Sequence, residues 1–138
     1  MKYGKKILFA VLLCFCMLFS GISMPLVVQA EETTRVEPRM TYISSYSNDL
    51  AISSTGVASI YGVVRGKSGV TSTYVKCTLQ ISVGGGWVDV KSWEASSTTI
   101  GATVAETYQL SSRGTYRVYT VCRANTEEKT ITSAYRTY

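Results

Sequence analysis

The side chains most able to do chemistry in this 138-residue chain are carboxylates and aromatic rings, because the chain contains no histidine. A chain without histidine lacks the usual general base, the commonest zinc ligand and every Ser-His-Asp or Cys-His arrangement. A pair of carboxylates could still serve a glycosidase. The candidates in the part expected to fold are Asp49, Asp89, Glu94, Glu106, Glu127 and Glu128. No cleft-forming helix or long loop accompanies them, so we expect a protein that is not an enzyme and that uses neither a cofactor nor a metal.

Ten tyrosines and two tryptophans are the positive chemical signal. Flat rings flanked by hydrogen-bonding groups suit contacts with glycans and proteins, because they bury large areas at low entropic cost. The aromatic residues on predicted outward strand positions are Tyr74, Trp87, Trp93 and Tyr119, with Tyr61 as a further candidate. They share these outward faces with the polar residues Lys76, Gln80, Asp89 and Arg117. The alternative is that these rings only pack against one another, because Tyr and Trp are good strand formers.

The four cysteines fall into two pairs. Cys14 and Cys16 lie in an apolar run near the N-terminus, whereas Cys77 and Cys122 lie in the part expected to fold. Period-two alternation places Cys77 and Cys122 on inward-facing positions, where they could meet across the core or between neighbouring strands. A disulfide between them would contribute about 4 kcal/mol through loss of chain entropy. Two buried free thiols are the alternative.

The first thirty residues are typical of an export signal. Three lysines within the first six residues precede an apolar run from Ile7 to Phe19, and the pattern Val28-Gln29-Ala30 is typical of a cleavage site. The apolar run would make a helix only about 20 Å long, too short to cross roughly 30 Å of hydrocarbon. We therefore expect a signal that is removed, and no membrane anchor.

This signal predicts the organisation of the chain. We expect cleavage between Ala30 and Glu31, a flexible leader over residues 31–38 and one folded domain over residues 39–138. The mature protein would be secreted to the extracellular side. The formal net charge of +5 includes three signal lysines, and the +2 that remains is too weak to predict a nucleic-acid partner.

The pattern after Pro38 predicts an all-β chain. Thr, Ser, Val and Tyr dominate, glycine recurs about every ten residues, and helical periodicity is absent. Seven short strands predict an antiparallel β-sandwich. Gly62, on an inward position, should make room for a bulky neighbour. The predicted strands are 41–52 with a break at Ser47-Asn48-Asp49, 56–65, 72–83, 87–94, 102–110, 114–124 and 129–137.

The glycine turn between the third and fourth strands decides where both tryptophans point. A two-residue turn at Gly84-Gly85 pairs Val83 with Gly86 and continues without interruption, which puts Trp87 and Trp93 on the outer face. The alternative three-residue turn would pair Val83 with Trp87 and would bury two charged residues of the fourth strand unless a bulge intervened. We therefore predict the two-residue turn.

One segment resembles a known family. Leu110 followed by Gly114-Thr115-Tyr116-Arg117-Val118 is similar to the corner and sixth strand of immunoglobulin-like and fibronectin type III modules, where a tyrosine after a glycine corner packs at the sandwich edge. In the immunoglobulin branch the second cysteine comes two residues after that tyrosine, where this chain has Val118. The usual inter-sheet disulfide therefore does not transfer to Cys122.

The whole layout also resembles short secreted single-domain β-sandwich proteins of Gram-positive bacteria with no assigned function. The shared features are the signal, a Tyr-Ile-Ser-Ser segment at the start of the domain (Tyr42 to Ser45) and a Gly-Thr-Tyr-Arg-Val strand. A hairpin that begins its second strand with Gly86-Trp87 and ends it with Lys-Ser-Trp (Lys91 to Trp93) is also shared. The resemblance implies an immunoglobulin-like sandwich and an extracellular location.

These expectations lead to one functional hypothesis with two alternatives. We expect a secreted module without enzymatic activity that binds a cell-surface glycan, wall polymer or protein through its aromatic face, with no nucleic-acid or membrane partner. The alternatives are a secreted effector, such as a small antimicrobial or an inhibitor, and a surface-structural subunit.

Overall fold

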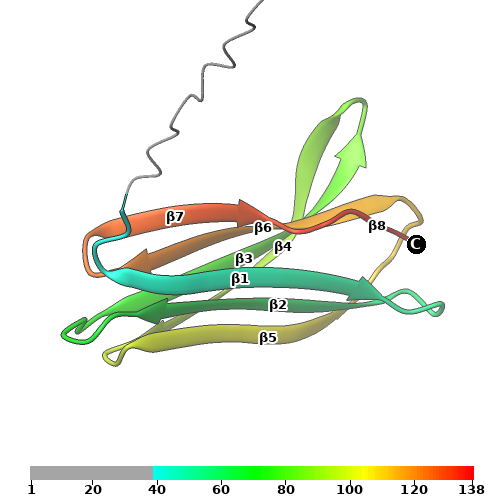
Figure 1. Cartoon of the computed structure of the whole chain (residues 1–138). Helices are drawn as coiled ribbons and strands as arrows, with labels where there is room; N and C mark the ends of the chain where they lie inside the picture. The colour runs from blue at the N-terminus through cyan, green and yellow to red at the C-terminus, as the bar shows by residue number, and fades with distance from the viewer. Residues whose placement is uncertain (1–38) are drawn as a thin grey trace, which may run out of the picture. The chain divides into compact units, whose positions relative to one another are not determined.

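The computed structural model describes residues 39–138 (Figure 1). The predicted signal over residues 1–30, its cleavage site at Ala30 and Glu31, and the leader over residues 31–38 lie outside the described residues. The described residues form eight strands and no helix: β1 (Ile43–Ile52), β2 (Val57–Gly66), β3 (Thr73–Val83), β4 (Gly86–Ser97), β5 (Gly101–Gln109), β6 (Thr115–Ala124), β7 (Glu127–Thr132) and β8 (Arg136–Thr137). Within this part, therefore, nothing helical is available to cross a membrane.

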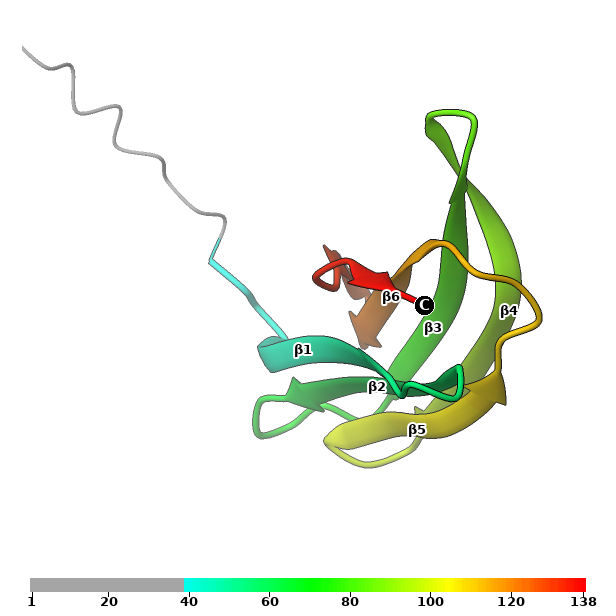
Figure 2. The same ribbon diagram turned by 90° about the vertical axis from the view of Figure 1, so that its right-hand side faces the viewer.

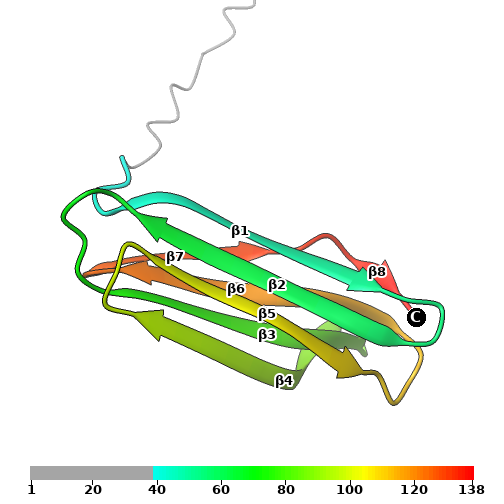
Figure 3. The ribbon, with the colours of Figure 1, turned by 90° about the horizontal axis from the view of Figure 1, so that it is seen from below.

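The strands form two antiparallel sheets that face each other (Figures 2 and 3). One sheet has the order β1-β2-β5, and the other has the order β4-β3-β6-β7 with β8 also paired to β6. The first, second and fifth strands lie together, as do the third, sixth and seventh, which is the arrangement of immunoglobulin-type sandwiches; β4 joins the second sheet beside β3. The predicted fold class, an all-β immunoglobulin-like antiparallel sandwich of about seven strands, is confirmed.

Alternating apolar residues from both sheets fill the core. On β3, Val75, Cys77 and Leu79 are fully buried, as predicted from their period-two spacing. Gly62 lies against this row, and a Cβ added there would sit 2.2 Å from the Cys77 sulfur. The expectation that Gly62 makes room for a bulky neighbour is therefore confirmed.

The corner that resembles immunoglobulin-like modules is present at the start of β6. Tyr116 is 2 % exposed, and its hydroxyl donates a hydrogen bond to the Ser112 carbonyl oxygen at 2.6 Å. This bond ties the β5–β6 connection, which crosses from one sheet to the other, to the start of β6.

Strand β1 is continuous, so the predicted break at Ser47-Asn48-Asp49 is wrong. Ser47 and Asp49 point to solvent, whereas Asn48 points inward opposite Gly62. The Asn48 side-chain nitrogen lies 3.1 Å from the Val118 carbonyl oxygen, 3.0 Å from Thr120 Oγ1 and 3.2 Å from the Ile131 carbonyl oxygen. These partners in the other sheet satisfy an amide that would otherwise favour a turn.

The last predicted strand, 129–137, is divided into β7 and β8. Between them the Ser133 hydroxyl accepts a hydrogen bond from the Val118 backbone N–H, and the Ser133 N–H donates to the Val118 carbonyl oxygen, both at 2.9 Å. The Ser133 hydroxyl thus takes the place of the backbone carbonyl oxygen that would accept from the Val118 N–H in a regular ladder. The chain can then leave the ladder and return as β8.

The β3–β4 hairpin has the predicted turn but only part of the predicted register. Gly84 and Gly85 have φ values of +58° and +81°, as a two-residue primed turn requires, and Val83 pairs with Gly86. The predicted pairing continues as far as Gln80 and Asp89, on the part of the hairpin that projects from the sandwich in Figure 1.

A β-bulge then changes the register. Leu79 pairs with Lys91, so Val90 is the extra residue on β4. Cys77 consequently lies opposite Trp93 and not opposite Ser92. Because a slip of one residue exchanges the two faces of a strand, the predicted outward position of Trp93 is wrong.

Candidate functional site: the outer face of the larger sheet

The outer face of the β4-β3-β6 strands carries most of the predicted aromatic residues. Tyr74 on β3 and Tyr119 on β6 are both partly exposed there. Trp87 on β4 lies on the same face, beside Ser82. Three of the four residues predicted to form a binding face therefore share one surface.

Trp93 does not belong to this surface. Its side chain is half-buried and packs against the core, where its ring meets that of Tyr108 edge to face with 5.9 Å between centroids. The bulge at Val90 causes this difference, because it shifts the residues after Val90 by one position, so that Trp93 faces the core as Val90 does.

Trp87 is the centre of a group of side chains from three strands and the C-terminal segment. We call Trp87, Arg117, Tyr135, Gln80 and Asp89 the Trp87 cluster. The Arg117 guanidinium lies over the indole, 4.1 Å from its centroid, in a cation–π contact. The Tyr135 ring lies 5.2 Å from the indole with 34° between the planes, and this tyrosine is 61 % exposed.

A row of hydrogen bonds fixes the guanidinium. Arg117 Nε donates to Gln80 Oε1 at 2.8 Å, and Gln80 Nε2 donates to Asp89 Oδ1 at 2.7 Å. The row crosses β6, β3 and β4 and holds Arg117 against the indole. Tyr135 was missed by sequence reasoning, because one continuous strand was predicted over residues 129–137, whereas the chain breaks between β7 and β8 at this point.

Tyr74 lies in a separate group in which the cation already has an acidic partner. Its hydroxyl donates to Glu94 Oε2 at 2.8 Å, and the Arg123 guanidinium lies 5.3 Å from the centre of its ring. Arg123 in turn forms an ion pair with Glu128. Desolvation and the hydrogen bond to Glu94 raise the pKa of Tyr74. This group stabilises the sheet surface, and its one cation is already paired.

Cys77 and Cys122 face the core as predicted, but the predicted disulfide between them is not formed: both are buried free thiols. Cys77 pairs with Thr120 and Cys122 with Val75, so the two cysteines are diagonal neighbours on β3 and β6. Diagonal Cα atoms lie about 7–8 Å apart, beyond the usual span of a disulfide. Burial raises the pKa of Cys77, and burial together with the Cys77 charge raises the pKa of Cys122 to about 12.

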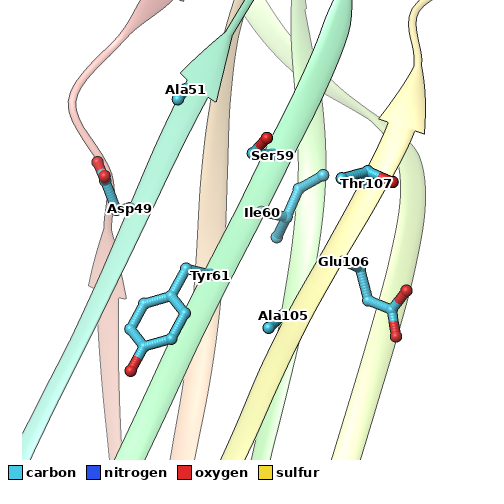
Figure 4. Close-up of a pocket in the computed structure, with 8 residues that line it drawn as sticks. All are labelled: Asp49, Ala51, Ser59, Ile60, Tyr61, Ala105, Glu106 and Thr107. Carbon is cyan, nitrogen blue, oxygen red and sulfur yellow. The ribbon is translucent and has the colours of Figure 1, made fainter.

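The other predicted outward tyrosine, Tyr61, lies on the opposite side of the molecule. It is 43 % exposed and borders a hollow of about 440 Å³ on the outer face of β1-β2-β5 (Figure 4). Small side chains form the floor of the hollow at Ala51, Ser59 and Ala105.

The carboxylates considered for glycosidase chemistry are dispersed. Asp49 on β1 and Glu106 on β5 line the hollow from opposite sides of β2 (Figure 4). Asp89, Glu94 and Glu128 bond to side chains on the other sheet, and Glu127 bonds to backbone N–H groups. In the part of the chain that the structure describes, no three His, Cys, Asp or Glu side chains are grouped to hold a metal ion.

Comparisons with known proteins assign no family to the chain, because no protein-family model and no curated protein matches the sequence. Among solved structures, the chain is similar to a CARDB domain of a Pyrococcus furiosus protein, solved in complex with di-metal ions. The identity is 14 %, the TM-score is 0.39, and the match covers 71 % of this chain and 92 % of that chain. This likeness concerns the fold alone.

Proposed function

We propose that this chain is a secreted binding module without enzymatic activity, and that it binds a cell-surface glycan, wall polymer or protein through the outer face centred on the Trp87 cluster. The observation that carries the proposal is the pair of neighbouring rings, Trp87 and Tyr135, on a surface whose polar side chains are already fixed in position.

Preorganisation is the physical basis of the proposal. Ordering flexible side chains on binding costs affinity, and the Arg117–Gln80–Asp89 row lowers this cost because the three side chains are already held. Rings beside hydrogen-bonding groups are typical of glycan and protein contact surfaces. Packing alone accounts for the face of Trp87 that Arg117 covers, but it does not account for the exposure of Tyr135.

The test compares two exposed aromatic residues on opposite sides of the molecule. The exported protein, its Trp87→Ala variant and its Tyr61→Ala variant are applied to a glycan array and to isolated bacterial walls. We expect Trp87→Ala to weaken binding at least about tenfold, as loss of a central aromatic contact does, and Tyr61→Ala to leave it unchanged. Equal binding by all three folded proteins would contradict the proposal.

A further inference from the structure

We infer that the Trp87 cluster selects an anionic glycopolymer, with Arg117 holding a carboxylate or phosphodiester group while Tyr135 contacts the adjacent sugar ring or polyol. This inference rests on the proposed function and names the chemical class of its ligand.

The free end of the Arg117 guanidinium is the position at which an anion would bind. Its Nε is occupied by Gln80, which leaves the two terminal nitrogens at the end of the fork. No carboxylate within residues 39–138 forms an ion pair with Arg117, since Asp89 bonds to Gln80 instead. Two parallel N–H groups of a guanidinium match the two oxygens of a carboxylate or phosphate.

Arg123 shows the contrast on the same face. It also lies over an aromatic ring, that of Tyr74, but its charge is neutralised by Glu128. Arg117 and Arg123 are therefore matched in position and in their aromatic contact, and they differ in whether an acidic partner is already bound. An anion should be attracted to the Arg117 end of the face and not to the Arg123 end.

The charges around the Trp87 cluster favour an anion despite Asp89. Arg117 lies at one end of the hydrogen-bonded row, and the one carboxylate of the cluster, Asp89, lies at the other end. A neutral glycan would use the rings and the amide but would leave the guanidinium fork unpaired.

The exposed ring favours a sugar polymer over an acidic polypeptide. Tyr135 is 61 % exposed and contacts the same indole as Arg117, so a pyranose or polyol next to the charged group can lie on that ring. An acidic polypeptide would satisfy Arg117 equally well, so it is included as an arm of the test.

The experiment measures binding of the exported protein to four immobilised probes: polygalacturonate, poly(glycerol phosphate), neutral dextran and poly-glutamate. We expect one of the two anionic glycopolymers to bind at least about tenfold more tightly than dextran, with an affinity that falls as salt rises. The polygalacturonate and poly(glycerol phosphate) arms distinguish a carboxylate from a phosphodiester source.

Three variants assign the effect to Arg117. Arg117→Gln should lose the preference for the anionic polymer by about tenfold or more, as expected for a charge-assisted bidentate contact. Arg117→Lys keeps the charge without the fork and should recover only part of the preference. Arg123→Gln is the matched control and should stay within about twofold of the parent protein. Thermal unfolding confirms that each variant is folded.

The outcomes separate this inference from the proposed function. Binding to dextran and to the anionic polymers with equal affinity, abolished by Trp87→Ala, would overturn the inference and leave the proposed function intact. Binding to poly-glutamate alone would also overturn it and would indicate an acidic protein partner. Binding to none of the probes by folded protein would overturn the inference, and the array and wall experiment would then decide the proposed function separately.

Discussion

Glu127 shows how one residue joins the start of β1 to the opposite sheet. Its carboxylate accepts hydrogen bonds from the backbone N–H groups of Thr41, Tyr42 and Ile43 at 3.1, 2.7 and 2.8 Å. Desolvation raises the pKa of Glu127, but the three N–H groups outweigh it and hold the pKa below its ordinary value. The ionised carboxylate thus fastens the start of β1 to the start of β7.

The pH dependence of stability should report this contact. A lowered pKa in the folded state means that the stabilisation is present above the unfolded pKa of about 4.5 and is lost as the pH falls through the folded value. We expect Glu127→Gln to lower the melting temperature at pH 7 and to lose this difference near pH 3. Glu128→Gln, which removes an exposed ion pair, is the control and should change stability little. A melting difference for Glu127→Gln that is the same at both pH values would argue against this role.

The buried cysteines give a second prediction at the scale of the residue. Because both thiols are buried and the pKa of Cys122 is raised to about 12, a thiol reagent at pH 8 should leave Cys77 and Cys122 unmodified in folded protein. Both should react once the protein is unfolded without reductant, as mass spectrometry would show. Protection that persists after unfolding and disappears only on reduction would mean that the two sulfurs are bonded.

The β3–β4 hairpin is the element in which sequence reasoning succeeds and then fails. Its turn was predictable, since only glycines adopt the two positive φ values readily. The bulge at Val90 was not predictable from local pattern, because any of several residues could be the extra one. The choice is made by tertiary packing, which brings Val90 and Trp93 together against the core and sets Trp93 on Tyr108.

Replacing each tryptophan tests this register. Trp93→Ala removes a half-buried ring and should lower the free energy of unfolding by about 2–3 kcal/mol. Trp87→Ala removes a surface ring and one cation–π contact and should cost about 1 kcal/mol or less. Urea unfolding measures both. Equal, small losses would favour the uninterrupted register with both rings outside.

At the scale of the whole molecule, different contacts join the two sheets at the two edges of the sandwich. Asn48 and Glu127 connect β1 to the opposite sheet by hydrogen bonds, whereas Trp93 and Tyr108 connect β4 and β5 by aromatic packing. The fold class could be predicted because alternate burial is a local property of each strand. The Trp87 cluster could be predicted only in part, because Tyr135 reaches it from the break between β7 and β8.

The two tryptophans allow the central claim to be tested in one measurement, because they lie on opposite faces of β4. In a ¹⁵N NMR titration of the protein with the anionic glycopolymers proposed above, each indole N–H gives its own signal, assigned with Trp93→Phe. The account predicts that the Trp87 signal shifts with saturation and that the Trp93 signal stays in place. Saturable binding that leaves Trp87 unperturbed would contradict it.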